Sequence, residues 1–276
     1  MTLIIGIRCR EGIVVAGDGA AQYAVMGRPT AQAATVRKLK IVHNKIIVGV
    51  SGPVGLAQRL TAHVEEGYAA GRYGGRAETA IGVMRSEFWR LIVEPEYNVA
   101  LSAGRLIGAQ IAMAPAISAM VVAMPFDAGA ELIQFDQQCA PELASDDLPC
   151  VAIGSGQPMT DPFLAFLRLI FFPRRVPSVQ DGVFCAVWAL QHAIDTMPGG
   201  VAEPKQVIVL ERKGQDWEAR ELPTAEIDIH VDAVRDAERT LTDWRSQFSA
   251  TPAGAPPAAP PAAPVSTGEH KVVTTA

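Results

Sequence analysis

The chain opens with the sequence TLIIGIRCREGIVVAGDG over residues 2–19. Two apolar runs rich in β-branched residues, Leu3 to Ile7 and Ile13 to Ala16, are joined by a polar corner at 10–12. Such runs, bounded by a turn, are typical of strands that are buried on both faces. We therefore expect the N-terminus to be threaded into a core, where a charged chain end costs free energy unless it is paired.

Thr2 stands at this buried chain start. Methionine followed by a small residue is the usual substrate for initiator removal, so we expect the mature chain to begin at Thr2. A terminal threonine carries a hydroxyl nucleophile and an amine whose ordinary pKa is about 7.7 to 8.0. One residue would then supply nucleophile and base together. The alternative is that Thr2 is simply the first residue of a strand.

The composition is that of a globular chain. Of its 276 residues, 49% are hydrophobic and 19% charged, which is enough for one large domain or two small ones. The net charge of -5 gives no electrostatic case for nucleic acid binding. No basic segment precedes Leu3, so no signal peptide is expected, and the apolar stretch 106–126 is interrupted by glutamine and proline, which argues against a membrane span. The expected location is the cytoplasm.

The cysteines and histidines predict neither a disulfide framework nor a metal site. The four cysteines lie far apart without a CxxC pair, and the five histidines lack the spacing of metal ligands. Reduced, buried thiols are the default in a cytosolic protein. We expect no metal and no cofactor.

Hydrophobic periodicity and turn residues predict blocks of strands and helices. Residues 19–35 are expected to form a long loop, followed by a hairpin and two helices, the second ended by Glu94-Pro95. The expected strands after the first two are 40–42, 45–50, 106–114, 118–124, 130–135, 150–153, 206–210 and 217–222. The expected helices are 56–69, 78–93, 162–172, 181–196 and 231–248, with a loop over 136–149.

This order of strands, two helices, strands, two helices and strands predicts an α+β fold. Two sheets packed face to face and covered on each side by a helix pair, an αββα four-layer sandwich, would produce the order and bury the N-terminal strand. We predict a domain over 2–225, a C-terminal helical extension over 226–249 and a disordered tail over 250–276. The Ala/Pro-rich tail cannot bury a core.

Five co-linear segments of the chain resemble proteasome β-type subunits. They are 2–7, 14–19, Lys38-Leu39, SGPVGLAQ at 51–58 and AIGSG at 152–156. The bacterial HslV branch is locally most similar, through AGDG at 16–19 and AIGSGQP at 152–158, and bacterial homologues of the Anbu type are also candidates. Over about 2–225, the resemblance implies an N-terminal nucleophile hydrolase that assembles into stacked homo-oligomeric rings around a chamber. In HslV-like members it also implies a ring ATPase unfoldase as partner.

The resemblance assigns the acid–base roles by position. Thr2 would be nucleophile and base, and Lys38 matches a buried lysine whose cation disfavours protonation of the threonine amine, which lowers the pKa of that amine. Asp18 matches the carboxylate that pairs with this lysine. Each residue taken alone has an ordinary structural explanation as a turn or surface residue.

Three further positions would support the reaction. The backbone N–H of Gly52 would stabilise the oxyanion, a contact worth roughly 2.7 to 4 kcal/mol in other hydrolases. Ser155 would orient the threonine amine, and Asp195 would hydrogen-bond that pair.

Substrate contacts are expected at Gln22, Val50 and Val54. Val50 and Val54 match positions lining the pocket for the residue before the scissile bond, so we predict a preference for an apolar side chain there. Gln22 falls where the family typically has a threonine that pairs with substrate backbone.

The chain also departs from the family pattern. Pro198 stands where a serine usually supports the amine, and proline has neither a side-chain donor nor an N–H. Leu56 occupies a position that is commonly aspartate, and the stretch between Asp18 and Lys38 is longer than usual. These departures predict weak or narrow activity.

The sequence therefore predicts a self-compartmentalising threonine-type peptidase acting on polypeptides. Two alternatives stay open. One is a catalytically silent, ring-forming proteasome homologue that serves as a scaffold or chamber, which Pro198 favours. The other is an N-terminal nucleophile amidase acting on a small amide, which would share the chemistry of Thr2.

Overall fold

The computed structural model describes the backbone of residues 2–25, 28–33, 35–107, 116–173, 175–197 and 200–249, and the same side chains except at 22–25, 28–33, 105–107, 248 and 249. The chain forms two compact units, residues 1–232 and 233–276. The helix α7 (Thr224–Ser249) begins in the first unit and continues in the second. No helix in the described ranges has both the length and the apolar character that a membrane span requires.

The first sheet contains the N-terminal strand. Its five antiparallel strands lie in the order β10-β1-β2-β11-β12. Their bounds are β1 (Ile4–Arg8), β2 (Gly12–Gly17), β10 (Cys150–Ile153), β11 (Gln206–Lys213) and β12 (Asp216–Glu221). Leu3, Ile4 and Ile5 are fully buried, which confirms that the chain start is threaded into the core.

The second sheet packs against the first. Its five antiparallel strands lie in the order β5-β6-β7-β8-β9. Their bounds are β5 (Leu39–Val42), β6 (Ile46–Ser51), β7 (Ala119–Phe126), β8 (Gly129–Phe135) and β9 (Pro141–Leu143). Side chains such as Ile4, Val15, Ile47 and Val121 fill the space between the two sheets. This buried layer explains why so many strands are apolar on both faces.

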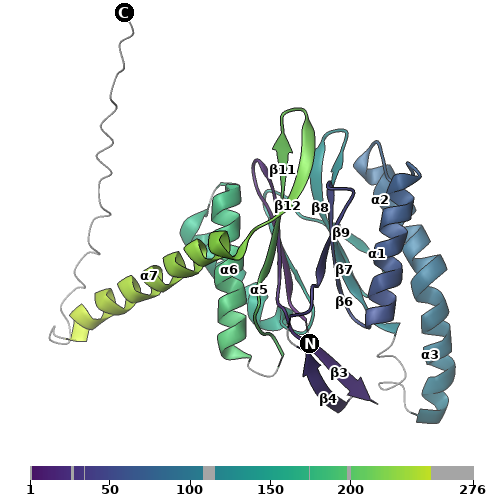
Figure 1. Ribbon diagram of the computed structural model, residues 1–276, viewed down its shortest axis with the longest axis horizontal. Helices are drawn as coiled ribbons and strands as arrows, with labels where there is room; N and C mark the ends of the chain where they lie inside the picture. Colours follow the sequence, from purple (N-terminus) through teal and green to yellow (C-terminus); the bar gives the residue numbers. More distant parts are fainter. Residues whose placement is uncertain are drawn as a thin grey trace, which may run out of the picture. The chain divides into compact units, whose positions relative to one another are not determined.

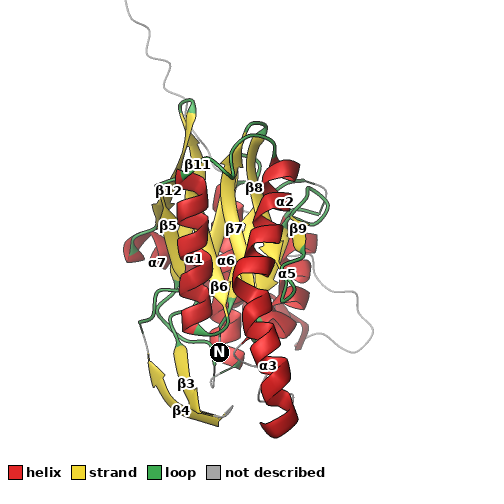
Figure 2. Ribbon diagram, turned by 90° about the vertical axis from the view of Figure 1, so that its right-hand side faces the viewer, coloured by secondary structure: helices red, strands yellow, loops and turns green. Residues whose placement is uncertain are grey.

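Helices cover the outer face of each sheet (Figures 1 and 2). On the second sheet they are α1 (Val54–Ala69), α2 (Ala77–Glu87) and the π-helix η1 (Phe88–Val93), and α3 (Glu94–Ile107) continues from η1. On the first sheet they are α5 (Gln157–Phe171) and α6 (Val179–Thr196). The structure thus confirms the predicted αββα sandwich.

Residues 19–35 differ from the expected loop. They contain the antiparallel hairpin of β3 (Ala21–Val25) and β4 (Arg28–Ala33), which projects from the end of the sandwich where the N-terminus lies (Figures 1 and 2). The stretch is small, polar and Ala-rich, so it lacks the apolar alternation by which a half-buried strand is recognised.

The second predicted helix also continues further than expected. Glu94-Pro95 does not end it, because α3 starts there directly after the π-helical turn of η1. Pro95 has no N–H to donate within this continuous helical run, and the hydrogen-bond pattern changes from π to α directly before it, at the junction of η1 and α3. The predicted strand 106–114 is wrong at Leu106 and Ile107, the last two residues of α3, and its remainder from 108 lies outside the described residues.

Smaller differences concern other boundaries. The expected loop 136–149 contains the short strand β9, and α5 begins at Gln157 rather than at Pro162. The helix α7 begins at Thr224, so the border predicted at 226 falls inside a helix. The tail predicted to be disordered, 250–276, lies outside the described residues.

Candidate active site

The strand β1 brings Thr2 to a glycine-flanked turn at the end of β10. Thr2 N donates a hydrogen bond to Ser155 Oγ at 3.1 Å, and Gly156 N donates to the carbonyl oxygen of Thr2 at 3.2 Å. Gly154 has a φ of +100°, and a Cβ there would lie 2.1 Å from Thr2 O. Glycine is therefore required at 154 for the approach of the chain start. Met1 precedes Thr2 in this chain, so Thr2 N is here a peptide nitrogen that would become the α-amine once Met1 is removed.

Asp18 joins the chain start to Lys38. Its side chain is fully buried at the end of β2, and Oδ1 accepts from Lys38 Nζ at 2.5 Å and from Leu3 N at 2.8 Å. Oδ2 accepts from the backbone N–H groups of Ala20 at 3.1 Å and Ala202 at 3.4 Å. A buried carboxylate needs such donors to remain charged. One oxygen thus holds both the lysine ammonium and the residue after Thr2.

The lysine itself is almost fully enclosed, with 6% of its side chain exposed. Burial lowers the pKa of Lys38 below its ordinary value, and the charge and hydrogen bond of Asp18 oppose this shift. Removing the ammonium from water costs free energy, and the negative charge of the nearby carboxylate compensates part of that cost.

Gln206 fixes the backbone next to Lys38, and sequence reasoning did not single it out. Its side-chain oxygen accepts from Leu39 N at 3.1 Å and its amide nitrogen donates to Leu39 O at 3.1 Å. Gln206 lies at the start of β11 in the first sheet and Leu39 at the start of β5 in the second, so this buried amide ties the two sheets together. The one signal in the sequence is a polar residue at the head of an apolar strand.

A cavity of about 590 Å³ opens at these residues. Thr2, Lys38, Gly52, Val50 and Val54 all line it. Gly52 has a φ of +142° and no room for a Cβ, which would lie 2.7 Å from Ile117 O. Val50 is buried and Val54 is 67% exposed, so one valine belongs to the wall and the other to the rim.

Of the described residues that the sequence assigned to the site, Asp195 is not joined to this group. Asp195 is exposed, and its Oδ1 accepts from Gln191 Nε2 at 2.9 Å, one turn earlier on α6. Within the described ranges, no hydrogen bond connects Asp195 to Ser155 or Thr2. Gln22 lies in β3, but its side chain is outside the described part, and Pro198 lies outside the described residues altogether.

The comparisons with known proteins agree with the fold. A family model described as proteasome subunit matches residues 2–84, which include Thr2, Asp18, Lys38 and Gly52. No curated protein sequence matches this chain. The solved structures that resemble this chain include those of Anbu, described as an ancestral β-subunit. The resemblance to proteasome-like proteins noted from the sequence is confirmed.

Three Anbu structures illustrate the likeness. Anbu from Yersinia bercovieri is 12% identical with a TM-score of 0.64, covering 91% of this chain and 98% of that one. A helical assembly of the Anbu complex from Pseudomonas aeruginosa is 15% identical with a TM-score of 0.63, covering 89% and 96%. Anbu from Hyphomicrobium sp. strain MC1 is 13% identical with a TM-score of 0.60, covering 87% and 97%. At this identity the likeness establishes the shared fold.

Proposed function

We propose that this proteasome-like chain is a threonine-type endopeptidase that works as a homo-oligomer, with Thr2 as the N-terminal nucleophile once Met1 has been removed. The observation that carries the proposal is the shared carboxylate. Asp18 Oδ1 binds the Lys38 ammonium and the backbone N–H of the residue after Thr2, and the nitrogen of Thr2 is held by Ser155. A nucleophile, a cation and an orienting hydroxyl therefore meet at one chain end.

The proposed reaction uses the threonine amine as general base. The Lys38 cation disfavours a second positive charge nearby, which keeps the amine unprotonated near neutral pH. The amine takes the proton of the Thr2 hydroxyl as Oγ1 attacks the peptide carbonyl. The backbone N–H of Gly52 stabilises the oxyanion that forms. The C–N bond then breaks, the leaving amine receives the proton, and water hydrolyses the resulting ester to free Thr2.

The specificity proposal follows from the cavity wall. Val50 is apolar. The three cations that line the cavity are already paired, Lys38 with Asp18, Lys40 with Glu65 and Arg37 with Glu221. An apolar side chain before the scissile bond would therefore be accommodated best. Fluorogenic peptides ending in leucine should be cleaved faster than those ending in arginine, and the reverse order would refute this specificity.

Intact-mass analysis with a covalent inhibitor tests the nucleophile. The purified chain should lack Met1 and gain one adduct on Thr2 after treatment with a β-lactone or epoxyketone. A Thr2→Ala variant, which keeps a small residue after Met1, should be processed but not labelled. A processed wild-type chain that gains no adduct would contradict the peptidase proposal, and a chain that retains Met1 would have no free threonine amine.

One observation favours the second candidate, a catalytically silent proteasome homologue. Asp195 accepts a hydrogen bond from Gln191 of its own helix and not from Ser155. It therefore does not supply the hydrogen bond that the resemblance predicted near the Thr2 amine. A silent subunit would be processed, would assemble, and would resist labelling of Thr2.

Self-assembly itself is proposed because the Anbu complex from Pseudomonas aeruginosa is described as a helical assembly. The ring arrangement and the unfoldase partner are proposals from the resemblance to HslV.

A further inference from the structure

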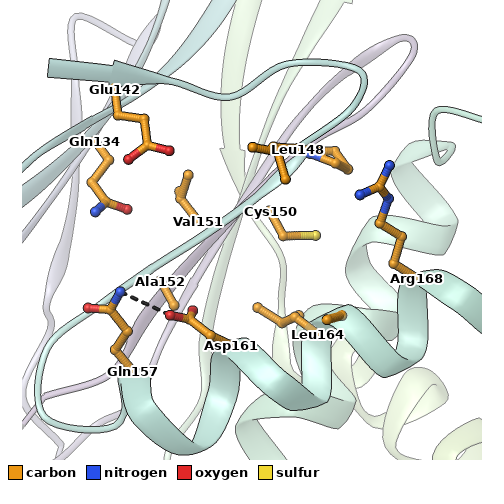
Figure 3. Close-up of a pocket in the computed structure, with 12 residues that line it drawn as sticks. Gln134, Glu142, Leu148, Cys150, Val151, Ala152, Gln157, Asp161, Leu164 and Arg168 are labelled. Carbon is orange, nitrogen blue, oxygen red and sulfur yellow. Dashed lines mark hydrogen bonds between the residues drawn. The ribbon is translucent and has the colours of Figure 1, made fainter.

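A cavity of about 330 Å³ lies between α5 and the strands β8, β9 and β10 (Figure 3). Small organic ligands occupy pockets of about 300 to 1,000 Å³. This cavity shares no lining residue with the cavity at Thr2. We call it the α5 cavity, because one of its walls is formed by Gln157, Asp161, Leu164, Ala165 and Arg168 of this helix. It is a second site of ligand size, and the reaction proposed for Thr2 gives it no role.

Charges of both signs line the α5 cavity and lie apart from each other. The carboxylates of Asp161 and Glu142 lie toward one end, and the guanidinium of Arg168 lies toward the other (Figure 3). Asp161 and Arg168 both belong to α5. Their spacing of about two helical turns places them on one face of the helix, with an axial separation of about 10.5 Å. An ion pair between them is therefore out of reach, and none is present.

Neither charge is neutralised by another side chain. Within the part of the chain that the structure describes, the Arg168 guanidinium has no ion pair or hydrogen bond, and the Asp161 carboxylate accepts only from the neutral amide of Gln157, at 3.0 Å. Burial raises the pKa of Asp161, and the hydrogen bond from Gln157 opposes this shift. Charges interact more strongly where protein walls displace water. Each end of the cavity can therefore gain from a ligand group of opposite charge.

The middle of the cavity is apolar. Leu148, Val151 and Leu164 lie between the two charged ends (Figure 3). Burial raises the pKa of the Cys150 thiol to about 12, so this thiol adds no charge near neutral pH. The lining therefore fits a small molecule with a cationic end, an anionic end and an apolar side chain between them.

We propose that the α5 cavity binds a dipeptide as its zwitterion, with the ammonium group at Asp161 and Glu142 and the carboxylate at Arg168. An extended dipeptide backbone spans at most about 7 Å, and one hydrogen bond of about 2.8 Å at each end lets it reach both charges of α5. A single amino acid, about 3.5 Å long, falls short of them. A planar guanidinium also matches the two oxygens of a carboxylate.

The apolar wall selects the side chains of the dipeptide. Leu148 and Leu164 would bury an apolar side chain on the residue that carries the carboxylate, which gains about 1.5 to 3 kcal/mol for a leucine when burial is complete. The site lies outside the catalytic cavity, and its occupation does not depend on whether Thr2 reacts.

Titration calorimetry with alanyl-leucine tests the proposal on the full-length chain carrying Thr2→Ala, which cannot hydrolyse the probe. Three matched probes each lack one feature. N-acetyl-alanyl-leucine has no ammonium group, alanyl-leucine amide has no carboxylate, and free leucine carries both charges at a shorter spacing. Alanyl-leucine should bind, and each matched probe should bind at least about tenfold more weakly.

Two variants assign the ends of the dipeptide to their partners. Arg168→Gln should weaken binding of alanyl-leucine about tenfold and should remove its advantage over the amide. Asp161→Asn should reduce the advantage of alanyl-leucine over the acetylated probe and leave its advantage over the amide. Arg212→Gln, at an exposed position on β11 outside the cavity, should leave binding unchanged.

Four results would each overturn the proposal. They are no binding of alanyl-leucine, equal binding of the acetylated or amidated probe, binding of free leucine as tight as that of the dipeptide, and unchanged binding by the Arg168→Gln variant. Labelling of Thr2 in the wild-type chain is a separate result and decides only the peptidase proposal.

Discussion

Two carboxylates of the candidate site, Asp18 and Asp195, have very different surroundings. Asp18 is fully buried at the end of a central strand and accepts from one ammonium and three backbone N–H groups. Asp195 is exposed near the end of α6 and accepts from a glutamine of its own helix. A carboxylate delivered by a sheet strand is fixed by the fold, whereas one near a helix end depends on the segment that follows. The comparison predicts that the reaction of Thr2 depends on Asp18 and Lys38 and does not depend on Asp195.

The largest effect is expected from Lys38→Met. The change leaves the buried Asp18 without its ammonium, and breaking a buried ion pair typically costs about 3 to 5 kcal/mol of unfolding free energy. We expect the lower end, because three backbone N–H groups still reach Asp18. Labelling of Thr2 should slow on the order of a hundredfold, because without the Lys38 cation the amine is more readily protonated and can no longer act as the base.

Urea unfolding and the rate of β-lactone labelling measure both effects of Lys38→Met. Lys40→Met is the matched control, because Lys40 forms an exposed ion pair with Glu65 and such pairs contribute little. If both variants are labelled at the wild-type rate, Lys38 has no part in the reaction.

Gly154→Ala should have the next largest effect. A φ of +100° is unfavourable for alanine, and the added Cβ would lie 2.1 Å from Thr2 O. The chain start must then move away from Ser155, with a cost of about 1 to 3 kcal/mol from the backbone alone. Labelling of Thr2 should fall about tenfold, since misplacing a reacting group has large effects on rate.

Gly71→Ala separates backbone strain from displacement of Thr2. Gly71 has a φ of +72°, but a Cβ there would meet nothing within 4 Å. This variant should lose stability in thermal unfolding while labelling of Thr2 stays at the wild-type rate. Equal loss of labelling in both variants would mean that global stability, and not the position of Thr2, limits the reaction.

Gln206→Leu, which acts on the backbone next to Lys38, should slow labelling of Thr2 less than Gly154→Ala does. Leucine leaves Leu39 N–H and C=O without their partners, which costs about 1 to 3 kcal/mol when such groups are buried. Because Leu39 follows Lys38, labelling should slow a few-fold and its pH profile should shift. Gln180→Leu, an exposed change on α6, serves as control. Loss of stability with an unchanged pH profile would limit Gln206 to a structural role.

The sequence could predict what local patterns encode. The apolar runs on either side of Gly12 and the order of strand and helix blocks predicted the sandwich. The resemblance identified Thr2, Asp18 and Lys38, which the structure brings together. Gln206 could not be predicted, because its partner Leu39 is 167 residues away and the contact exists only after two sheets pack. The hairpin β3–β4 was missed because a polar, Ala-rich hairpin carries no apolar alternation.

Asp195→Asn should have the smallest effect. It tests whether Asp195 supports the Thr2 amine, as the family resemblance implies, or only bonds to Gln191, as the structure shows. The family pattern expects Asp195 to support the Thr2 amine, which predicts a large loss of labelling. The structure places its carboxylate on Gln191, where asparagine can still accept through its side-chain oxygen. We therefore expect labelling within about twofold of wild type and a stability change below about 0.5 kcal/mol, as for other surface substitutions. A loss of labelling comparable to that of Lys38→Met, with unchanged urea unfolding, would show that Asp195 reaches the amine in the processed, assembled protein. The two carboxylates would then be equivalent partners of Thr2.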